Sequence, residues 1–428
     1  MVRTKRLAVT AALAAVLAAM PVAALATTAG YFELGYSSKN DGLAGAGVAL
    51  PEDSMAQAVN PAGIAFVGSR VDLGAAAFWA FRGYSANSLA PAHCVYCGSS
   101  SDFFVIPHVG VTYALDGSNT VGLAMYGNGG MSTNYKIANT FFAGQTGVNF
   151  KQLFMQASYA YKFTRHDSVG VGLLYVRQYF SDSGLGAFSG NSTNAAALTN
   201  NGVDMGTGFG IRLGTQIRLM RNLNLGLSWT PEIHMSRFAS YSGLFADGGN
   251  FNIPETWTGG LAFKPLRHQV VAFDVQRIMY GAIPSIGHSG SYMNQCFSSP
   301  TQPNSPYCLG GESGPGFGWQ DITVYKLGYQ IATSRQWTWR AGFAYNTQPV
   351  PGDQLMFNTL APGVIQRDIT AGFTRHITHT QDLTVAAMWG MPQKVYQGAN
   401  PSFLQFGRGP TYVYLHEYEL NLNWGIKF

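Results

Sequence analysis

The 428-residue sequence is poor in charge, since only 11% of its residues are Asp, Glu, Lys or Arg, whereas soluble globular chains average about 25%. The net charge of +5 is small for this length and comes from no basic cluster, so nucleic-acid binding is not supported. After the N-terminal segment no run of about 18 consecutive apolar residues occurs, which excludes a membrane-spanning helix. These absences argue against both an ordinary soluble protein and a helical membrane protein.

Aromatic residues and glycine are abundant instead: Phe, Trp and Tyr make up 13% of the chain, and 52 residues are Gly. The N-terminus has a basic start, an apolar run at 7–20 and an A-x-A peptidase site at 24–26, which are typical of a secretory signal. We expect residues 1–26 to be a signal peptide and the mature chain to begin near Thr27; the alternative is an uncleaved anchor. An exported chain of this composition indicates a β-barrel of the bacterial outer membrane.

The clearest periodicity lies at the C-terminus, in the stretch TYVYLHEYELNLNWGIKF. From Tyr418 to Phe428, apolar side chains occupy every second position, with polar or small residues between them. Successive side chains of a strand point to opposite faces, and a barrel in lipid needs an apolar outer face and a polar lumen face. A half-buried strand of a soluble sandwich alternates similarly but rarely over such a length, so the pattern favours a transmembrane strand.

Similar segments recur along the chain, and we count fourteen expected strands. They are 69–82, 102–115, 119–131, 151–163, 168–180, 206–219, 222–236, 253–264, 268–280, 318–331, 335–346, 364–376, 382–394 and 410–428. Short links alternate with long ones such as 132–150, as expected for periplasmic turns and extracellular loops. The predicted fold is all-β: a fourteen-stranded antiparallel transmembrane barrel over residues 69–428, closed so that no strand edge faces lipid.

Residues 27–68 precede the first expected strand and show no extended alternation. A disordered periplasmic tail, the alternative, should be polar and charged, whereas this segment holds many apolar residues around Asn60-Pro61-Ala62. We expect it to be a hatch that plugs the barrel lumen, where an apolar segment can be buried. The glycines of GLAGAG at 42–47 lack the spacing and the preceding strand of a dinucleotide-binding fingerprint.

Four cysteines, Cys94, Cys97, Cys296 and Cys308, are expected to form disulfides in an exported chain. The simplest pairing is Cys94–Cys97 and Cys296–Cys308, although four cysteines allow three pairings. His93 beside the first pair could instead begin a metal site, but a structural zinc site normally needs four ligands and no nearby partner is evident. We expect no metal.

Four segments in chain order resemble the FadL/TodX family of outer-membrane transporters for long-chain fatty acids and aromatic hydrocarbons. The segment GLAGAGVALPEDSMAQAVNPAGIAF is similar to the family's hatch, with its motif at Asn60, Pro61 and Ala62. IPETWTGGLAF at 253–263, GWQDITVYKLGYQ at 318–330 and WTWRAGFAYNTQPVP at 337–351 resemble strand motifs of the family. The resemblance covers essentially the whole mature chain and implies a fourteen-stranded barrel plugged by an N-terminal hatch.

The resemblance also implies passive uptake of hydrophobic small molecules through a loop groove, a lumen pocket near the mature N-terminus and a sideways exit. The ligand-binding candidates are Leu244, Phe245 and Phe251 for the groove and Tyr31, Phe32, Arg177, Trp319 and Gln320 for the pocket. Gln320 stands where fatty-acid members of the family carry a positive charge, and Arg177 is the nearest remaining cation, unless it is simply a wall residue. A pocket without a cation should favour neutral hydrophobes, because burying a lone carboxylate is costly.

The exit implied by the resemblance is a kink in the third strand, for which the candidates are Gly127, Asn128, Gly129 and Gly130. Glycine weakens a strand and marks bulges or close approach of another backbone. The alternative is that these residues simply end the strand.

No motif joins the nine His residues to a nucleophile, so we expect neither enzyme activity nor a cofactor. A general diffusion porin and a structural or adhesive barrel remain as alternatives, although the apolar segment 27–68 argues against an open porin. The expected partners are a hydrophobic ligand and the lipid and lipopolysaccharide of the outer membrane, with no nucleic acid, and the protein is expected to be a monomer.

Overall fold

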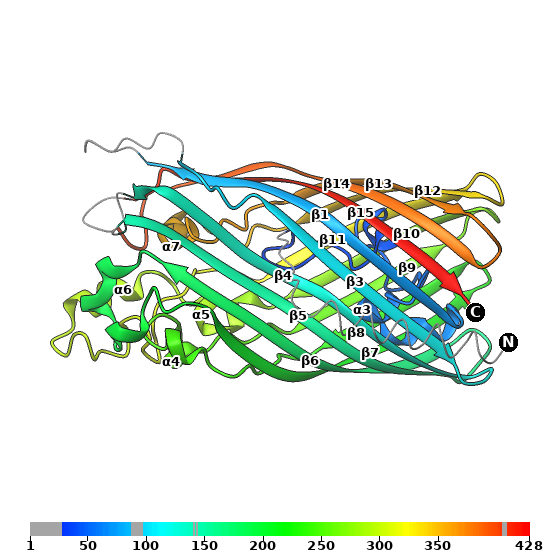
Figure 1. The fold of residues 1–428 in the computed structure, drawn as a ribbon, viewed down its shortest axis with the longest axis horizontal. Helices are drawn as coiled ribbons and strands as arrows, with labels where there is room; N and C mark the ends of the chain where they lie inside the picture. The colour runs from blue at the N-terminus through cyan, green and yellow to red at the C-terminus, as the bar shows by residue number, and fades with distance from the viewer. Residues whose placement is uncertain (1–27, 87–96, 140–141, 143, 405–408) are drawn as a thin grey trace.

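The computed structural model describes residues 28–86, 97–139, 142, 144–404 and 409–428 (Figure 1). In this part of the chain, fourteen long antiparallel strands form one barrel, closed by pairing of β15 with β1, which confirms the predicted fold. The strands are β1 (Arg70–Ser85), β3 (Phe103–Ala114), β4 (Asn119–Asn139), β5 (Gly144–Lys162), β6 (Ser168–Ser183), β7 (Asp204–Met220), β8 (Leu223–Thr230), β9 (Thr256–Phe263), β10 (Gln269–Ile278), β11 (Ile322–Ala332), β12 (Trp337–Asn346), β13 (Arg367–His376), β14 (Gln381–Tyr396) and β15 (Tyr412–Lys427). The two-residue strand β2 (Cys97–Gly98) pairs only with the last residues of β1.

Alternation along β15 separates a lipid face from a lumen face. Tyr418, Leu420, Leu422 and Trp424 are 44–51% exposed, whereas the acidic and amide side chains between them are buried. Exposed apolar side chains in such a continuous row are expected only where lipid covers them. The polar row faces inward and contacts the hatch.

Proline sets the ends of two strands that the sequence pattern makes too long. The predicted strand 222–236 stops at Thr230, because Pro231 follows and has no N–H to donate to the ladder. The predicted strand 253–264 begins only at Thr256, after Pro254.

The largest difference from the predicted strands lies at β4 and β5. The range 132–150 was expected to be a long loop, but the two strands pair through it as far as Asn139 and Gly144. Met131 and Phe150 lie opposite each other and are buried. The stretch is rich in Ser, Thr and Asn, which hides the period of two, and it forms lumen wall where a loop was predicted.

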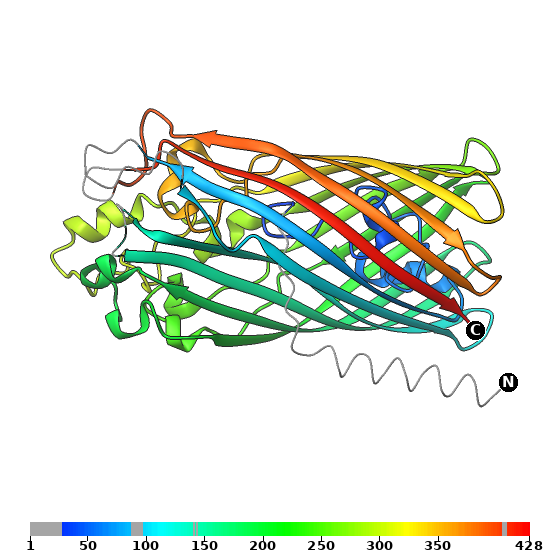
Figure 2. The same cartoon turned by 45° about the horizontal axis from the view of Figure 1, so that its top comes forward.

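The two ends of the barrel differ, as Figures 1 and 2 show. Short turns lie at the end near the C-terminus, and long connections gather at the other end, which by this asymmetry is extracellular. These connections contain the α-helices α4 (Ala246–Gly249), α5 (Pro284–Gly287), α6 (Tyr292–Ser298) and α7 (Leu355–Asn358) and the 3-10 helices η2 (Gly186–Asn191), η3 (Ala195–Ala197), η4 (Ala239–Tyr241), η5 (Tyr280–Ala282) and η6 (Gly352–Gln354).

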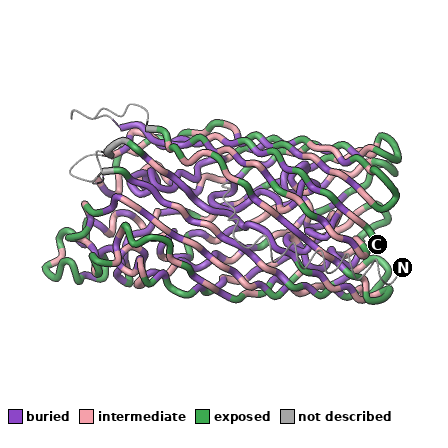
Figure 3. Tube along the Cα trace, viewed as in Figure 1, coloured by how far each residue is buried: buried purple, intermediate pink, exposed green. Residues whose placement is uncertain are grey.

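The hatch lies inside the barrel, toward the periplasmic end (Figures 1 and 2). It contains α2 (Ser38–Asp41), α3 (Ala56–Val59) and the 3-10 helix η1 (Pro61–Phe66). Most of its residues are buried. Figure 3 shows buried positions along the whole barrel and exposed ones gathered in the turns and loops at its two ends. The expected signal peptide at 1–26 lies outside the described residues.

The Asn60-Pro61-Ala62 motif ties the hatch to itself and to the wall. The Asn60 side chain accepts a hydrogen bond from the Ala62 N–H (3.1 Å) and donates to the carbonyls of Val48 (2.8 Å) and Thr215 of β7 (3.0 Å). Pro61 opens η1, where its missing N–H costs nothing and its fixed φ suits the turn. One amide thereby caps a helix and joins two hatch segments to the barrel.

Buried polar contacts hold the hatch to strands on several sides of the lumen. Glu52 pairs with Arg340 of β12 through two contacts of 3.0 Å, and Lys39 pairs with Asp382 of β14 at 3.0 Å. Two backbone N–H groups of the hatch donate to Asp274 of β10 at 2.8 and 2.9 Å. Breaking such a buried pair leaves a charge without compensation, which costs about 3–5 kcal/mol.

The loop between β10 and β11 contains the disulfide Cys296–Cys308, which confirms that predicted pairing; Cys94 of the other predicted pair lies outside the described residues. In denaturant without reductant, we expect Cys296 and Cys308 to resist alkylation and to react fully after reduction. Peptide mass spectrometry checks this. Labelling of either thiol before reduction would contradict the pairing.

Candidate functional site

The barrel wall is interrupted between β3 and β4. These strands pair only from Ala114 opposite Thr120 up to His108 opposite Tyr126, and toward the extracellular end they separate. Pro107, which cannot donate to a ladder, occupies β3 where the pairing stops. On the other side of β4, its pairing with β5 shifts register between Gly127 and Gly129, so that Asn128 is the extra residue of a bulge.

The start of the hatch occupies the free edge of β4 at this bulge. The Glu33 N–H donates to the Asn128 carbonyl (3.0 Å), and the Gly130 N–H donates to the Tyr31 carbonyl (3.0 Å). Gly129 between them has φ +146°, and a Cβ there would lie 1.7 Å from the Tyr31 oxygen. Only glycine therefore allows the hatch to lie on β4. We call residues 29–33 the latch.

Farther along the same edge, other groups replace the missing strand. The buried Arg82 guanidinium of β1 donates to the carbonyls of Ser101 (2.8 Å) and Ser132. The Ser100 N–H donates to the Asn134 carbonyl (2.9 Å). A buried backbone group without a hydrogen-bond partner is costly, so the latch, Arg82 and the segment around Ser100 together satisfy the free edge of β4 along the wall gap.

The latch also belongs to an aromatic cluster in the lumen. The Tyr31 ring centroid lies 5.1 Å from that of Tyr280, 5.7 Å from Phe150 and 6.1 Å from Trp319. Tyr280 donates its hydroxyl to the Ala29 carbonyl (2.6 Å) and accepts from the Tyr31 N–H (3.2 Å). The cluster connects the latch to strand β5 through Phe150 and to the long connection between β10 and β11 through Tyr280 and Trp319.

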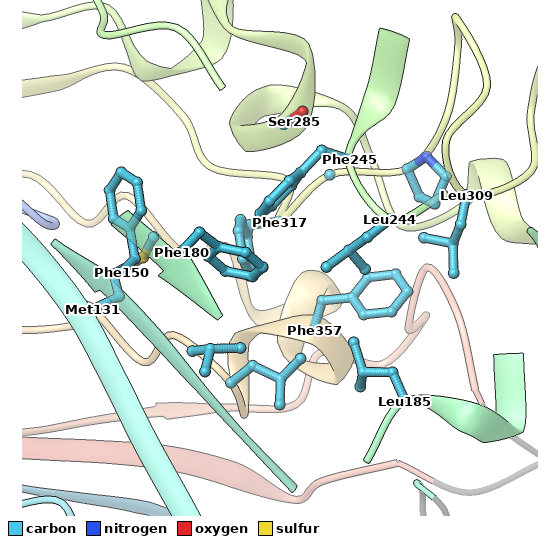
Figure 4. Close-up of a pocket in the computed structure, with 14 residues that line it drawn as sticks. Met131, Phe150, Phe180, Leu185, Leu244, Phe245, Ser285, Leu309, Phe317 and Phe357 are labelled. Atoms are coloured by element: carbon cyan, nitrogen blue, oxygen red, sulfur yellow. The ribbon is translucent and has the colours of Figure 1, made fainter. Parts of the chain in front are cut away.

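An apolar pocket adjoins this cluster and shares Phe150 with it (Figure 4). Its lining is apolar except for Ser285, whose hydroxyl donates to the Asn250 carbonyl. The lining residues are Met131, Val148, Phe150, Phe180, Leu185, Leu244, Phe245, Ser285, Leu309, Pro315, Gly316, Phe317, Phe357 and Leu360. Among the residues that the structure describes, no charged side chain lines this pocket, so a bound carboxylate would find no counter-charge from them.

Several of the residues expected from the sequence come together at this pocket. Leu244 and Phe245 line it, and Phe251 is buried beside it, with ring centroids 4.7 Å from Phe150 and 5.0 Å from Phe245. Tyr31, Phe32 and Trp319 belong to the neighbouring aromatic cluster. The apolar residues predicted for the loop groove and the aromatic residues predicted for the lumen pocket therefore lie in one apolar region.

Two expected pocket residues lie elsewhere. Gln320 is exposed and joins the fold through its backbone N–H to the Pro349 carbonyl (2.8 Å), while its neighbour Trp319 points inward. Arg177 lies on the outer face of β6, because the residues of opposite parity, Val176 and Gln178, are fully buried on the lumen side. Gln320 and Arg177 therefore point away from the pocket, and the expectation that they face the ligand is wrong.

Sequence reasoning missed the part of the pocket that β4, β5 and β6 supply. Met131, Val148 and Phe150 fall in or beside the range predicted as a loop, and Phe180 ends a predicted strand. The signal that could have found Met131, Val148 and Phe150 is the alternation of apolar and polar residues along β4 and β5. The many Ser, Thr, Asn and Gly residues of this stretch obscure that alternation.

Within the described residues, no helix is both long enough and apolar enough to cross a membrane. The same residues contain no group of three or more His, Cys, Asp or Glu that could hold a metal ion.

A closed barrel with an internal hatch and an uncharged apolar pocket defines a channel protein of the bacterial outer membrane. The profile of the family described as outer membrane protein transport protein (OMPP1/FadL/TodX) matches residues 19–391. The chain belongs to this family, which is one of transport channels and not of enzymes.

Solved structures of similar fold include the toluene transporter TodX of Pseudomonas putida, with TM-score 0.66 and 16% identity over 92% of this chain and 99% of that one. A FadL homologue of Pseudomonas aeruginosa has TM-score 0.66 and 14% identity over 94% and 100% of the two chains. The toluene transporter TbuX of Ralstonia pickettii has TM-score 0.62 and 16% identity over 92% and 99%. At these identities the likeness establishes the fold alone. No curated protein sequence matches the chain.

Proposed function

We propose that this protein is a passive channel that takes up neutral hydrophobic small molecules, with aromatic hydrocarbons as the favoured class. The observation that carries the proposal is the uncharged apolar pocket inside the barrel, which is lined by side chains of β4, β5, β6 and the extracellular loops. Apolar solutes gain free energy on leaving water for such a surface. Leu244 and Phe245 extend the pocket into the extracellular loops, where a ligand would enter.

The proposed exit is sideways, through the wall gap between β3 and β4. Met131 lines the pocket and stands next to Gly130, at which the latch is bound. A ligand that displaces Tyr31 from its aromatic neighbours would therefore loosen the latch at the same time. An apolar molecule leaving by this route enters lipid and never crosses bulk periplasmic water.

The two rival functions fit the molecule less well. A general diffusion porin needs an open polar lumen, whereas here the hatch lies in the lumen toward the periplasmic end (Figure 2) and most of its residues are buried. A structural or adhesive barrel needs no internal apolar cavity. Uptake of an apolar substrate that depends on pocket residues would separate the proposal from both.

Uptake measurements with two ligand types test the proposal. In cells that lack their own channel of this kind, we expect the protein to accelerate entry of an aromatic hydrocarbon well above entry of a long-chain fatty acid. Leu360→Arg, which puts a buried cation into the pocket, should reduce hydrocarbon entry by about tenfold or more, since an unpaired buried charge costs several kcal/mol. The exposed Leu266→Arg is the matched control. Preferential uptake of the fatty acid by the wild type would overturn the neutral-ligand proposal.

The latch should respond to pH through Glu33. Burial, followed by the nearby Glu419, Asp41 and Glu417 carboxyls, raises the pKa of Glu33 well above its ordinary value. Glu33 therefore binds a proton more tightly when the latch is docked than when the latch is released. Lowering the pH toward the ordinary Glu pKa of about 4.3 consequently stabilises the docked latch.

We therefore expect uptake to slow as the pH falls through this window, by up to about tenfold per pH unit. Glu33→Gln should flatten the profile, and Glu312→Gln, in an exposed loop, should not. Uptake by reconstituted vesicles across the pH range measures this. The same slope in wild type and Glu33→Gln would disprove the role of Glu33.

A further inference from the structure

Two cations stand on the outer face of the wall beside the kink. Lys151 lies an even number of positions from the exposed Ala157 on β5, and Arg177 lies an even number from the exposed Leu173 on β6, so both cations point outward. The alternate residues of each strand face the lumen. Leu153, two positions from Lys151, lies opposite Arg177, so the two cations are diagonal neighbours across the β5–β6 pair. Cations on a lipid face are costly at mid-membrane and become acceptable at the interfaces.

Strand geometry places these cations at the extracellular interface. Lys151 and Tyr161 are ten positions apart on β5, with Tyr161 beside the periplasmic turn. That separation is roughly 33 Å of strand, or about 25 Å along the membrane normal at a tilt of about 40°, which equals the apolar band of such barrels. Tyr161 thus marks the periplasmic rim of the band, and Lys151 marks the extracellular rim.

The Tyr175 side chain holds the Arg177 guanidinium in place. The Arg177 Nε donates to the Tyr175 hydroxyl (3.1 Å), and its guanidinium carbon lies 5.6 Å from the centre of the Tyr175 ring. Among the described residues neither Lys151 nor Arg177 has a carboxylate within ion-pairing distance. The positive charge of both is therefore available on the membrane side.

Beside the cations, apolar side chains pack together on the outer face of the wall. Val109, Met125 and Leu153 point outward by alternation and yet are only 1–5% exposed, because they pack against one another and against Met155. A partly open apolar groove adjoins this cluster on the outer face and shares Met125 and Met155 with it. Its lining residues are Val111, Leu123, Ala124, Met125, Met155, Gln156, Ala157, Leu173, Leu174, Tyr175 and Phe209.

We propose that this face binds one phosphorylated lipid of the extracellular leaflet, with a phosphate between Lys151 and Arg177 and an acyl chain in the groove. The distance fits, because Ala157 lies six positions from Lys151, roughly 20 Å of strand and about 15 Å of depth, half of the ~30 Å hydrocarbon core. Arg and Lys are the side chains suited to phosphate. In the outer membrane the lipid of that leaflet with this chemistry is lipopolysaccharide.

The site adjoins the proposed exit without depending on it. Lys151 is the register partner of Gly130, at which the latch is bound. A lipid held there would cover the outer side of the kink, and any molecule leaving through the wall gap would pass beside its acyl chain.

Lipid retention by the full-length protein tests the proposal. Wild type and variants are extracted from outer membranes in mild detergent, and bound lipopolysaccharide is counted by native mass spectrometry and by hydroxy-fatty-acid content. We expect Lys151→Gln with Arg177→Gln to retain on the order of tenfold less. The control pair Arg367→Gln with Lys394→Gln, exposed cations at the extracellular ends of β13 and β14, should retain as much as the wild type.

The groove is tested separately. Ala157→Trp fills it and should reduce retention several-fold, whereas Ala387→Trp, at an exposed alanine of β14, should not. Washing with inorganic phosphate should leave the wild-type complex intact, and rebinding should require lipid that retains its phosphates. Equal retention by the wild type and the Lys151/Arg177 variant would overturn the proposal, as would an unaffected Ala157→Trp variant or displacement by phosphate alone. Heat-modifiable mobility on gels verifies that each variant is folded.

Discussion

Removal of residues 28–67 is expected to turn a closed barrel into a conducting one. The hatch lies inside the lumen toward the periplasmic end and most of its residues are buried, so we expect its loss to leave a water-filled pore within a fourteen-stranded wall. We expect single-channel conductance in planar bilayers to rise at least tenfold above that of the intact protein, since conduction through an aqueous lumen replaces leakage past packed side chains.

The barrel should survive this deletion. The charges that the hatch now pairs, such as Arg340 and Asp274, would face water in the open lumen and be solvated. Heat-modifiable mobility serves as the folding control. As a matched control, removing the exposed loop residues 299–304, which leaves both cysteines of the disulfide in place, should not open the pore. An unchanged conductance after hatch removal would show that these residues do not plug the channel.

Gly129→Ala is expected to release the latch. The added Cβ would meet the Tyr31 carbonyl at 1.7 Å, and alanine is strained at φ +146°. Because the clash is with backbone, no rotamer change relieves it. We expect residues 29–33 to leave the β4 edge, the wall gap to stay open, and uptake of an aromatic hydrocarbon to rise several-fold.

Two measurements check this prediction. Limited proteolysis should cut the N-terminal segment of Gly129→Ala much faster than that of the wild type, and the uptake assay should show the gain. Gly259→Ala is the matched control, because a Cβ there meets only the end of the Leu227 side chain, at 3.2 Å. If Gly129→Ala is cleaved and takes up hydrocarbon at the same rates as the wild type, the latch does not control the exit through the wall gap.

Whether a structural feature can be predicted from the sequence depends on whether local or long-range interactions determine it. Each strand has lipid on one face and the lumen on the other, so apolar and polar residues alternate along it. This alternation predicts all fourteen strands, with errors only in where they begin and end. Proline explains the errors at Thr230 and Thr256. The extended pairing of β4 with β5 was missed because its lumen-facing apolar residues are separated by Ser, Thr and Asn.

The site was less predictable, because residues distant in sequence create it. The glycines at 127–130 mark a bulge from sequence alone, but the hydrogen bonds of Gly130 and Asn128 to the latch depend on where the hatch lies in the lumen. Arg177 is a cation in a strand, and only the register of that strand decides whether it faces ligand or lipid. Arg82 gave no signal at all, since its partners are backbone carbonyls.

The anchors of the hatch constrain how the chain can assemble in the membrane. Asn60, Glu52 and Lys39 bind strands β7, β12 and β14, which lie on different sides of the lumen. The hatch is followed immediately by β1, whose pairing with β15 closes the barrel. Because the hatch contacts several strands and leads directly into β1, we expect it to be seated in the lumen before β1 and β15 meet and close the barrel.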